Sequence, residues 1–380
     1  MPLRHSRGGA IERRMLELAA AQARRGHKVV VYSAEAQDSS LEFNGFEFRT
    51  MLCRRAGGLR RFEFMKKAIR DAGSLPCDVL HFHSMPEGAV FSSGIDARKV
   101  LSYDYFIFRK GKKTPLYWYY RHALSKFDCL LPVSDFCRKE SLRYWHLEEV
   151  PNAIFHNGVN LDQFRPSNEE RTTMRRKLGL KNEPVVLYVG RVCAQKGTDV
   201  LVDGYARLRT AIPNARLLIA GPADLFGKSG GNELTKRIHD VGGIYLGAVE
   251  ENELAAVYNA GDVFVMATRR DEMFGMAAVE AQACGKPVIC SEHGGLPEVI
   301  SRESGLYFPV GDSQALAQQL GEVFGSGDLL NRMSSAAINN AQRFGWDRLA
   351  AEAETLYVRR TGNDPKALTI SEARVSAPSQ

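Results

Sequence analysis

The chain has 380 residues with 44% hydrophobic content, enough for two hydrophobic cores, because single domains usually stop growing near ~150–200 residues. Its net charge of +7 is dispersed, its seven cysteines lack metal or redox spacing, and no nucleic-acid module signature is present, so we expect no nucleic-acid partner. No apolar run approaches the ~18 residues of a membrane span, and the start lacks a signal peptide, so we expect a cytoplasmic protein with at most peripheral contact with the inner face of the membrane.

Short apolar runs bounded by turn residues alternate with helical patterns along the chain. A helix at 11–25 with one apolar face, for example, stops at Gly26 and feeds the first predicted strand. Buried strands separated by helices are typical of parallel sheets, so we predict an α/β fold. The predicted strands are 29–32, 79–82, 100–103, 130–133, 185–189, 216–220, 263–266 and 288–290.

The N-terminal series begins without a strand. A doubly wound domain should start with a strand that leads into its glycine loop, but here Gly8 and Gly9 arrive after only seven residues of low apolar content. We therefore expect the first strand to be absent, which leaves a gap beside the strand at 29–32. Either translation begins upstream of Met1 or another element fills the position.

A turn-rich connector at 151–166, which carries an Asn-Gly dipeptide, separates two series of strands. It divides the chain into two Rossmann-like domains, which we place at 1–165 and 166–344. A helix with aromatic anchors follows at 345–360. The composition of 361–380 is typical of a disordered tail.

Two cations follow the strand at 185–189. After Gly190, the turn presents Arg191 and Lys196 five residues apart. Arginine can bind phosphate oxygens in a fork and lysine supplies a mobile charge, so the pair suits a diphosphate and its departure. An arginine and a lysine on an exposed loop would be the preferred interpretation if this motif stood alone.

Two carboxylates, Glu272 and Glu280, lie across a predicted loop-to-helix boundary with seven residues between them. Phe274 and Gly275 break the chain after the first, and the helix begins at Met276. Free amides at a helix start suit a phosphate, and carboxylates suit sugar hydroxyls, so the segment suits a glycosyl nucleotide. The alternative is a solvated helix start with one capping carboxylate.

The order Gly-Arg-x4-Lys-Gly and then Glu-x7-Glu resembles the retaining glycosyltransferases of family 4, whose fold is called GT-B. The resemblance implies two Rossmann-like domains facing a cleft, with the acceptor on the N-terminal side and the nucleotide sugar on the C-terminal side. It implies that the helix at 345–360 crosses back onto the first domain. In that family the first carboxylate contacts the donor sugar and the second the ribose, which the match carries onto Glu272 and Glu280.

Weaker matches lie in the N-terminal half. Gly8 and Gly9 resemble the family's glycine loop near the donor phosphate, although glycine pairs are common in ordinary turns. Two-residue alternation places His81 and His83 on the same side of their strand. His83 matches the family's histidine beside the donor sugar, with a buried structural histidine as the alternative.

Other segments remain open. Ser134 is as easily a helix cap as a ligand contact. The pair Gly294 and Gly295 is read as mainly structural. The aromatic and basic segments at 104–109 and 117–120 depart from the family pattern where the acceptor site is usually shaped; they could contact a sugar or a lipid head group, or pack in the core.

We therefore predict a retaining, metal-independent transfer of a hexosyl group from a UDP- or GDP-sugar to an acceptor hydroxyl, in glycan, polysaccharide, glycolipid or small-molecule glycoside biosynthesis. No Asp-x-Asp motif or cofactor motif is present. The alternatives are a non-hydrolysing sugar-nucleotide epimerase and a non-catalytic GT-B subunit. The expected catalytic residues are Glu272, Arg191, Lys196 and His83, and the expected nucleotide-sugar-binding residues are Gly8, Gly9, Gly190, Phe274, Gly275, Met276 and Glu280.

Overall fold

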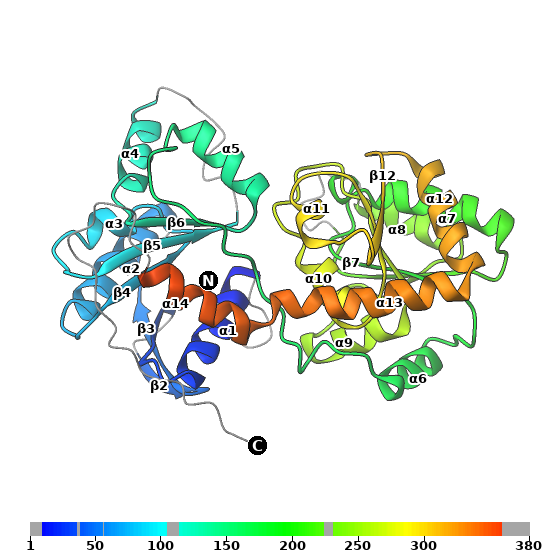
Figure 1. Ribbon diagram of the computed structural model, residues 1–380, viewed down its shortest axis with the longest axis horizontal. Coiled ribbons are helices and arrows are strands. Elements are labelled where there is room, and N and C mark those ends of the chain that lie inside the picture. Colours follow the sequence, from blue (N-terminus) through cyan, green and yellow to red (C-terminus); the bar gives the residue numbers. More distant parts are fainter. Residues whose placement is uncertain (1–9, 36–38, 56, 105–113, 224–230, 359–380) are drawn as a thin grey trace, which may run out of the picture.

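Two α/β domains lie side by side, and the C-terminal helices run from one to the other (Figure 1). The predicted glycine loop at Gly8 and Gly9 and the predicted tail at 361–380 lie outside the described residues. The computed structural model describes residues 10–35, 39–55, 57–104, 114–223 and 231–358.

The N-terminal domain contains two three-stranded sheets. Its described strands are β1 Val30–Glu35, β2 Ser39–Phe43, β3 Phe46–Leu52, β4 Val79–His83, β5 Arg98–Tyr103 and β6 Cys129–Pro132. The sheet orders are β1-β3-β2, in which only β2 is antiparallel, and β4-β5-β6, which is wholly parallel. Within the described residues, β1 and β4 share no ladder; the segment before α1, on which the predicted absence of a first strand depends, lies outside them.

Two helices of this domain, α4 and α5, begin at side-chain caps. The side chain of Thr114 accepts a hydrogen bond from the Tyr117 amide, and that of Ser134 accepts one from Cys137. Ser134 is thus the helix cap that the sequence allows. The helices are α1 Ala10–Arg24, α2 Gly57–Ala72, α3 Gly88–Phe91, α4 Pro115–Leu124 and α5 Asp135–Trp145.

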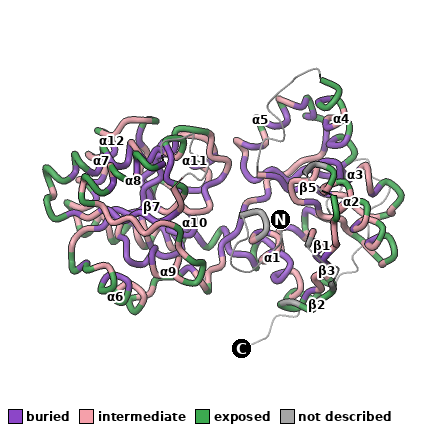
Figure 2. Tube along the Cα trace, turned by 180° about the vertical axis from the view of Figure 1, so that it is seen from behind, coloured by how far each residue is buried: buried purple, intermediate pink, exposed green. Residues whose placement is uncertain are grey.

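The C-terminal domain is built on one six-stranded parallel sheet in the order β12-β11-β10-β7-β8-β9. These strands are β7 Val185–Val189, β8 Arg216–Ala220, β9 Ile244–Tyr245, β10 Val263–Met266, β11 Val288–Ser291 and β12 Gly305–Phe308. The central strands are almost fully buried, which explains their continuous apolar runs (Figure 2). Since β7 and β10 are parallel neighbours, the loops that follow them meet at one edge of the sheet.

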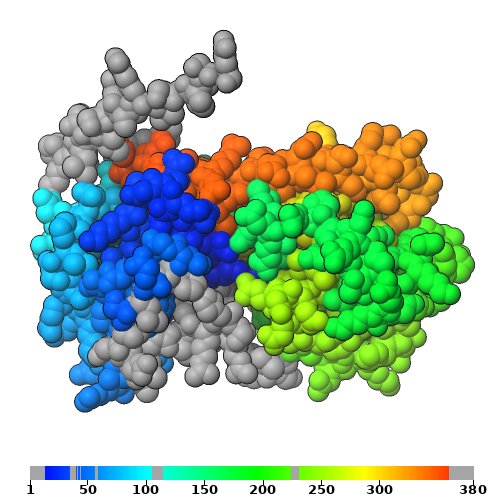
Figure 3. Space-filling view, turned by 90° about the horizontal axis from the view of Figure 1, so that it is seen from below, coloured from blue at the N-terminus to red at the C-terminus, as the bar shows by residue number. Residues whose placement is uncertain are grey.

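Helices cover this sheet and then cross to the other domain. They are α6 Asn168–Lys177, α7 Thr198–Ala211, α8 Gly231–Asp240, α9 Glu251–Ala260, α10 Met276–Ala283, α11 Leu296–Val299, α12 Ser313–Gly325, α13 Gly327–Ala341 and α14 Trp346–Val358. In Figure 3 the orange to red C-terminal segment extends along both halves of the molecule. Buried residues of α14, such as Leu349 and Ala353, pack with Leu18 and Ala21 of α1.

The connector between the domains is fixed against this crossing segment. The amide of Val159 donates to the Phe344 carbonyl oxygen at 2.8 Å. A Cβ on Gly158 would lie 2.5 Å from the Trp346 ring, so glycine is required for this close approach. The connector and the start of α14 therefore set the relative position of the two domains.

Candidate active site

Lys196 reaches the space between the domains because of a sharp turn behind it. β7 leads into a short 3-10 helix that ends at Lys196. Gly197 follows with a φ of 69°, and a Cβ there would lie 1.7 Å from the carbonyl oxygen of Ala267, just after β10. Any side chain would force this backbone apart. The close approach places the Lys196 Nζ atom 2.5 Å from Oε2 of Glu272.

The loop that carries Glu272 is anchored by the residue two positions later. Phe274 is buried and packs against the rings of His156 and Phe344, with centroid distances of 5.7 and 5.5 Å. Gly275 then begins α10 with a φ of 101°, which other residues rarely adopt. The side chain of Phe274 therefore packs with core residues, and the residue also borders the pocket described next.

These elements border a pocket of about 230 Å³. The N-terminus of α10 faces the pocket, and the free amides of a first helical turn suit an anionic group. Lys196 and Glu272 form the C-terminal side of the pocket, and Asp104 and Asn157 come from the N-terminal domain and the connector. The lining residues are Asp104, Asn157, Tyr188, Val189, Gly190, Lys196, Met266, Glu272, Met273, Phe274, Gly275, Met276 and Ala277.

Six of the residues predicted from the sequence line this pocket: Gly190, Lys196, Glu272, Phe274, Gly275 and Met276. Arg191 does not line it. Its side chain is exposed, while its carbonyl oxygen accepts a hydrogen bond from the Tyr188 hydroxyl at 2.8 Å. The structure therefore brings only one of the two predicted cations into the pocket.

Glu280 is buried beside the pocket and does not line it. The Tyr258 hydroxyl donates to its Oε2 atom at 2.7 Å, and Arg13 of α1 lies 3.3 Å from Oε1. Burial raises the pKa of the Glu280 carboxyl group, and the positive charge of Arg13 opposes that shift. Glu280, which was predicted to contact the ribose, thus forms an ion pair with Arg13 of the N-terminal domain.

His83 lies at the end of β4 and stacks on His81, with ring centroids 4.3 Å apart. The prediction that both rings share one side of the strand is confirmed. His81 is bound by Tyr357 and Ser102, whereas Nδ1 of His83 is buried and has no partner among the described residues. Burial and the nearby Arg14 lower the pKa of the His83 imidazole to about 3, so it is neutral near pH 7.

Two buried groups were not predicted from the sequence, and a third residue, which lines the pocket, lies in a segment that the sequence left open. Arg14 is buried under α14, over the Phe155 ring at 5.3 Å, and donates to the Phe155 carbonyl oxygen. Asn157 was read only as part of a turn; its Oδ1 atom is buried and has no hydrogen-bond partner in the described part of the chain. Asp104 directly follows β5 and opens the segment 104–109, which the sequence left open between a sugar contact, a lipid contact and core packing; its position at a strand's carboxyl end favours a site residue.

In the residues that the structure describes, no three His, Cys, Asp or Glu side chains are grouped so that they could bind a metal ion. None of the described helices combines the length and apolar character needed to cross a membrane.

Two family models match consecutive parts of the chain: "Glycosyltransferase Family 4" over residues 8–163 and "Glycosyl transferases group 1" over residues 170–340. Among curated proteins, the D-inositol 3-phosphate glycosyltransferase of Streptomyces bingchenggensis is 35% identical over 243 residues, which is 60% of this chain and 52% of that protein. The corresponding enzyme of Xylanimonas cellulosilytica is 35% identical over 219 residues, covering 55% and 51%. The aligned part thus spans about half the length of these relatives.

Solved structures share the fold. A glycosyltransferase from Rickettsia africae superposes with a TM-score of 0.76 at 20% identity, covering 92% of this chain and 94% of that one. Anabaena HepE in complex with UDP and glucose has a TM-score of 0.74 at 21% identity, covering 92% and 96%. At such identity these structures establish the two-domain GT-B architecture alone.

Proposed function

Because the chain belongs to the family 4 glycosyltransferases, we propose that it transfers a hexosyl group from a nucleoside diphosphate sugar to an acceptor hydroxyl with retention of configuration. The observation that carries the proposal is the Lys196–Glu272 pair at the N-terminus of α10. A cation and free helix amides suit a diphosphate, and a carboxylate suits sugar hydroxyls. The HepE complexes with UDP and UDP-glucose make UDP-sugars the first donors to test.

In the proposed reaction, the bond between the sugar anomeric carbon and the diphosphate oxygen breaks, and a bond to the acceptor oxygen forms on the same face. The acceptor proton passes to the departing phosphate oxygen. Lys196 and the α10 amides stabilise the charge that develops on the diphosphate. His83 serves as a neutral polar contact, since its lowered pKa leaves the imidazole uncharged near pH 7, with one N–H donor and one acceptor nitrogen.

The test is incubation with a panel of UDP- and GDP-sugars, with mass-spectrometric detection of products. An inositol phosphate is the first acceptor to include, because the curated relatives are named for that reaction. Transfer to an acceptor supports the proposal. Epimerised donor would indicate the alternative epimerase, and an unchanged donor would indicate a non-catalytic subunit.

Removal of divalent metal with EDTA is expected to leave most of the activity. Lys196 and the helix amides take the role that a metal ion has in other glycosyltransferases, and the sequence has no Asp-x-Asp motif. The measurement compares initial rates with EDTA and with added Mg²⁺ or Mn²⁺. Complete loss of activity that only a metal restores would contradict this expectation.

Arg191→Ala is expected to weaken nucleoside diphosphate binding by about threefold to tenfold, because an exposed arginine outside the pocket acts through a largely screened charge. A calorimetric titration with UDP measures the change at two salt concentrations. The effect should shrink at high salt. A loss as large as that of a Lys196 variant would show that Arg191 enters the pocket when the nucleotide binds.

We also propose a peripheral contact with an anionic membrane surface through α2 and α4. Leu59 and Phe62 of α2 and Trp118 of α4 are 58%, 40% and 56% exposed. Exposed basic residues lie along and before α2, and such a mixture of apolar and basic groups complements anionic lipid head groups. These basic residues are Arg54, Arg55, Lys66 and Arg70.

This contact predicts co-sedimentation with phosphatidylglycerol vesicles and weak binding to phosphatidylcholine vesicles. Phe62→Ala combined with Trp118→Ala should reduce the bound fraction at least about threefold, since exposed aromatic groups supply the apolar part of such binding. Equal binding to both vesicle types, or none, would refute the membrane contact.

A further inference from the structure

Glu298 joins the two domains through the N-terminus of a helix. It belongs to α11 of the C-terminal domain, and its two carboxylate oxygens accept hydrogen bonds from the amides of Asp135 and Phe136 at 2.6 and 2.8 Å. These residues open α5 of the N-terminal domain. The first amides of a helix lack intrahelical partners and carry the positive end of its dipole, so a carboxylate is favourable there. The start of α5 is therefore completed by the other domain.

On the C-terminal side, the segment that leads to Glu298 packs on the backbone of Glu272. The Gly295 amide donates to the Glu272 carbonyl oxygen at 2.7 Å. A Cβ on Gly294 would lie 2.4 Å from that same oxygen, and a Cβ on Gly295 would lie 2.4 Å from the Met273 carbonyl oxygen. The glycine pair thus has a structural role, and a displacement of α11 would move Glu272.

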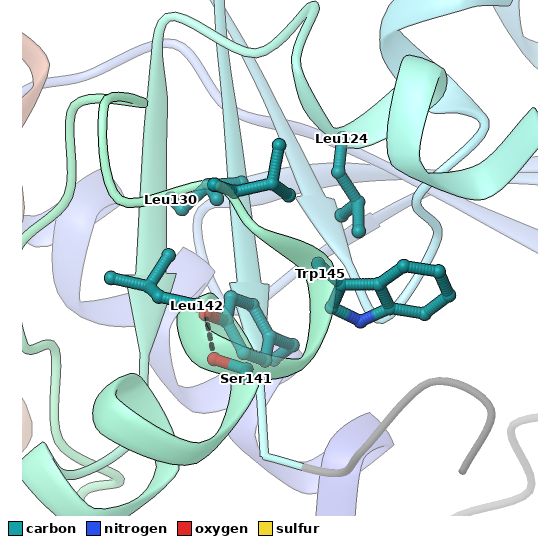
Figure 4. A pocket seen from close by; sticks show the side chains of 7 residues that line it. Leu124, Leu130, Ser141, Leu142 and Trp145 are labelled. Carbon is teal, nitrogen blue, oxygen red and sulfur yellow. Dashed lines mark hydrogen bonds between the residues drawn. The ribbon is translucent and has the colours of Figure 1, made fainter. Parts of the chain in front are cut away.

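On the N-terminal side, α5 fixes the end of β5. The Ser141 and Tyr103 hydroxyl groups are 2.7 Å apart in a hydrogen bond (Figure 4). The Val133 amide, just before α5, donates to the Tyr103 carbonyl oxygen at 3.1 Å. Tyr103 is buried, and the next residue, Asp104, lines the pocket.

We propose that Glu298 is a positioning residue that couples closure of the two domains to the placement of Glu272 and Asp104 on opposite sides of the pocket. The inference rests on the proposed glycosyl transfer. Contacts run without interruption from Glu272 through the glycine pair and Glu298 to α5, and from α5 through Tyr103 to Asp104. The hydrogen bonds that Glu298 accepts from Asp135 and Phe136 form only when α5 and α11 meet, so the same contact positions both sides of the pocket.

Glu298→Gln tests the carboxylate side of this contact. Its turnover should fall about tenfold or more, because a neutral amide binds the helix amides less strongly and one of its two terminal groups is a donor. UDP affinity should stay within about twofold, because Lys196 and α10 both belong to the C-terminal domain. Glu292→Gln, in the loop that precedes α11 and exposed, is the matched control and should behave as wild type.

A pair of variants tests the amide side. Proline is favoured at the first helical position, and Ser134 before it is extended with φ of −155° and ψ of 165°, as a residue before proline requires. Asp135→Pro therefore removes one amide donor and keeps the helix, whereas Asp135→Ala removes the same side chain and keeps the donor. We expect a turnover loss in Asp135→Pro and not in Asp135→Ala. Adding Glu298→Gln to Asp135→Pro should cost less than Glu298→Gln alone, because only the Phe136 amide still donates to Glu298.

Equal turnover in Asp135→Pro and Asp135→Ala would overturn the inference, as would an equal loss of UDP affinity and turnover in Glu298→Gln. Small-angle X-ray scattering tests the contact without activity: Glu298→Gln should have a larger radius of gyration than wild type, and identical curves would also overturn it. If the wild-type protein has no transfer activity, the proposed function is contradicted. The scattering comparison alone would then test whether Glu298 holds the two domains together.

Discussion

Replacement of Glu272 with glutamine is expected to lower turnover by about 100-fold or more, the scale of removing one positioned polar group in an active site. The Glu272 carboxylate lies in the pocket beside Lys196, where it can accept hydrogen bonds from two sugar hydroxyls. Glutamine has nearly the same shape, and the backbone hydrogen bond from Gly295 remains, so the loop keeps its position. The variant therefore changes the chemistry and not the fold.

The same substitution should not weaken binding of the free nucleoside diphosphate. Without its carboxylate partner, the Lys196 ammonium group is available to the phosphates, so UDP affinity should be equal or higher. Steady-state rates and a calorimetric UDP titration measure the two effects, and thermal unfolding checks the fold. Glu292→Gln is the control. Wild-type turnover in Glu272→Gln would remove this residue from the donor site.

Strands that are preceded and followed by turn residues were predictable from their apolar runs. β7, β8 and β10 begin and end at the predicted residues. β5 begins two residues earlier than predicted, because Arg98 and Lys99 pair with β4 through their backbones, and this pairing does not require apolar side chains. Apolar periodicity therefore locates the buried part of a strand and misses its charged ends.

The hairpin of β2 and β3 was missed, although a signal for it was present. Asn44 and Gly45 form a two-residue turn in which both φ angles are positive, 49° and 83°. Asn-Gly is the preferred sequence for such a turn. Charged residues such as Glu42, Glu47 and Arg49 interrupt the apolar runs on both sides of the turn. The segment therefore lacks the continuous apolar pattern of a buried strand.

The candidate site was predictable where its parts are contiguous in the chain. Glu272 and the start of α10 are separated by three residues, so their proximity follows from local structure. Asp104, Asn157 and Glu298 were not predictable in this way. Their positions depend on the packing of two domains and on contacts between residues more than a hundred positions apart. One such contact is the hydrogen bond from the Asp135 amide to the Glu298 carboxylate.

Lys196→Met is expected to weaken UDP binding by about 100-fold, a larger effect than loss of one exposed cation. The substitution keeps much of the side-chain volume but leaves the Glu272 carboxylate unpaired in a pocket where that carboxylate is only 17% exposed. An unpaired negative charge at 2.5 Å from the position of the lost ammonium group would repel the diphosphate. Turnover should fall as well, because the leaving group loses its cation.

The double variant Lys196→Met with Glu272→Gln separates the two contributions to binding. If repulsion by Glu272 accounts for part of the loss, the double variant should bind UDP about tenfold more tightly than Lys196→Met alone, since directly paired charges give non-additive effects. Turnover should not recover, because the carboxylate that we propose contacts the sugar is also gone. A double variant that binds UDP as weakly as Lys196→Met alone would mean that the Glu272 carboxylate does not repel the diphosphate, and the Lys196–Glu272 ion pair would then not describe the nucleotide-binding state.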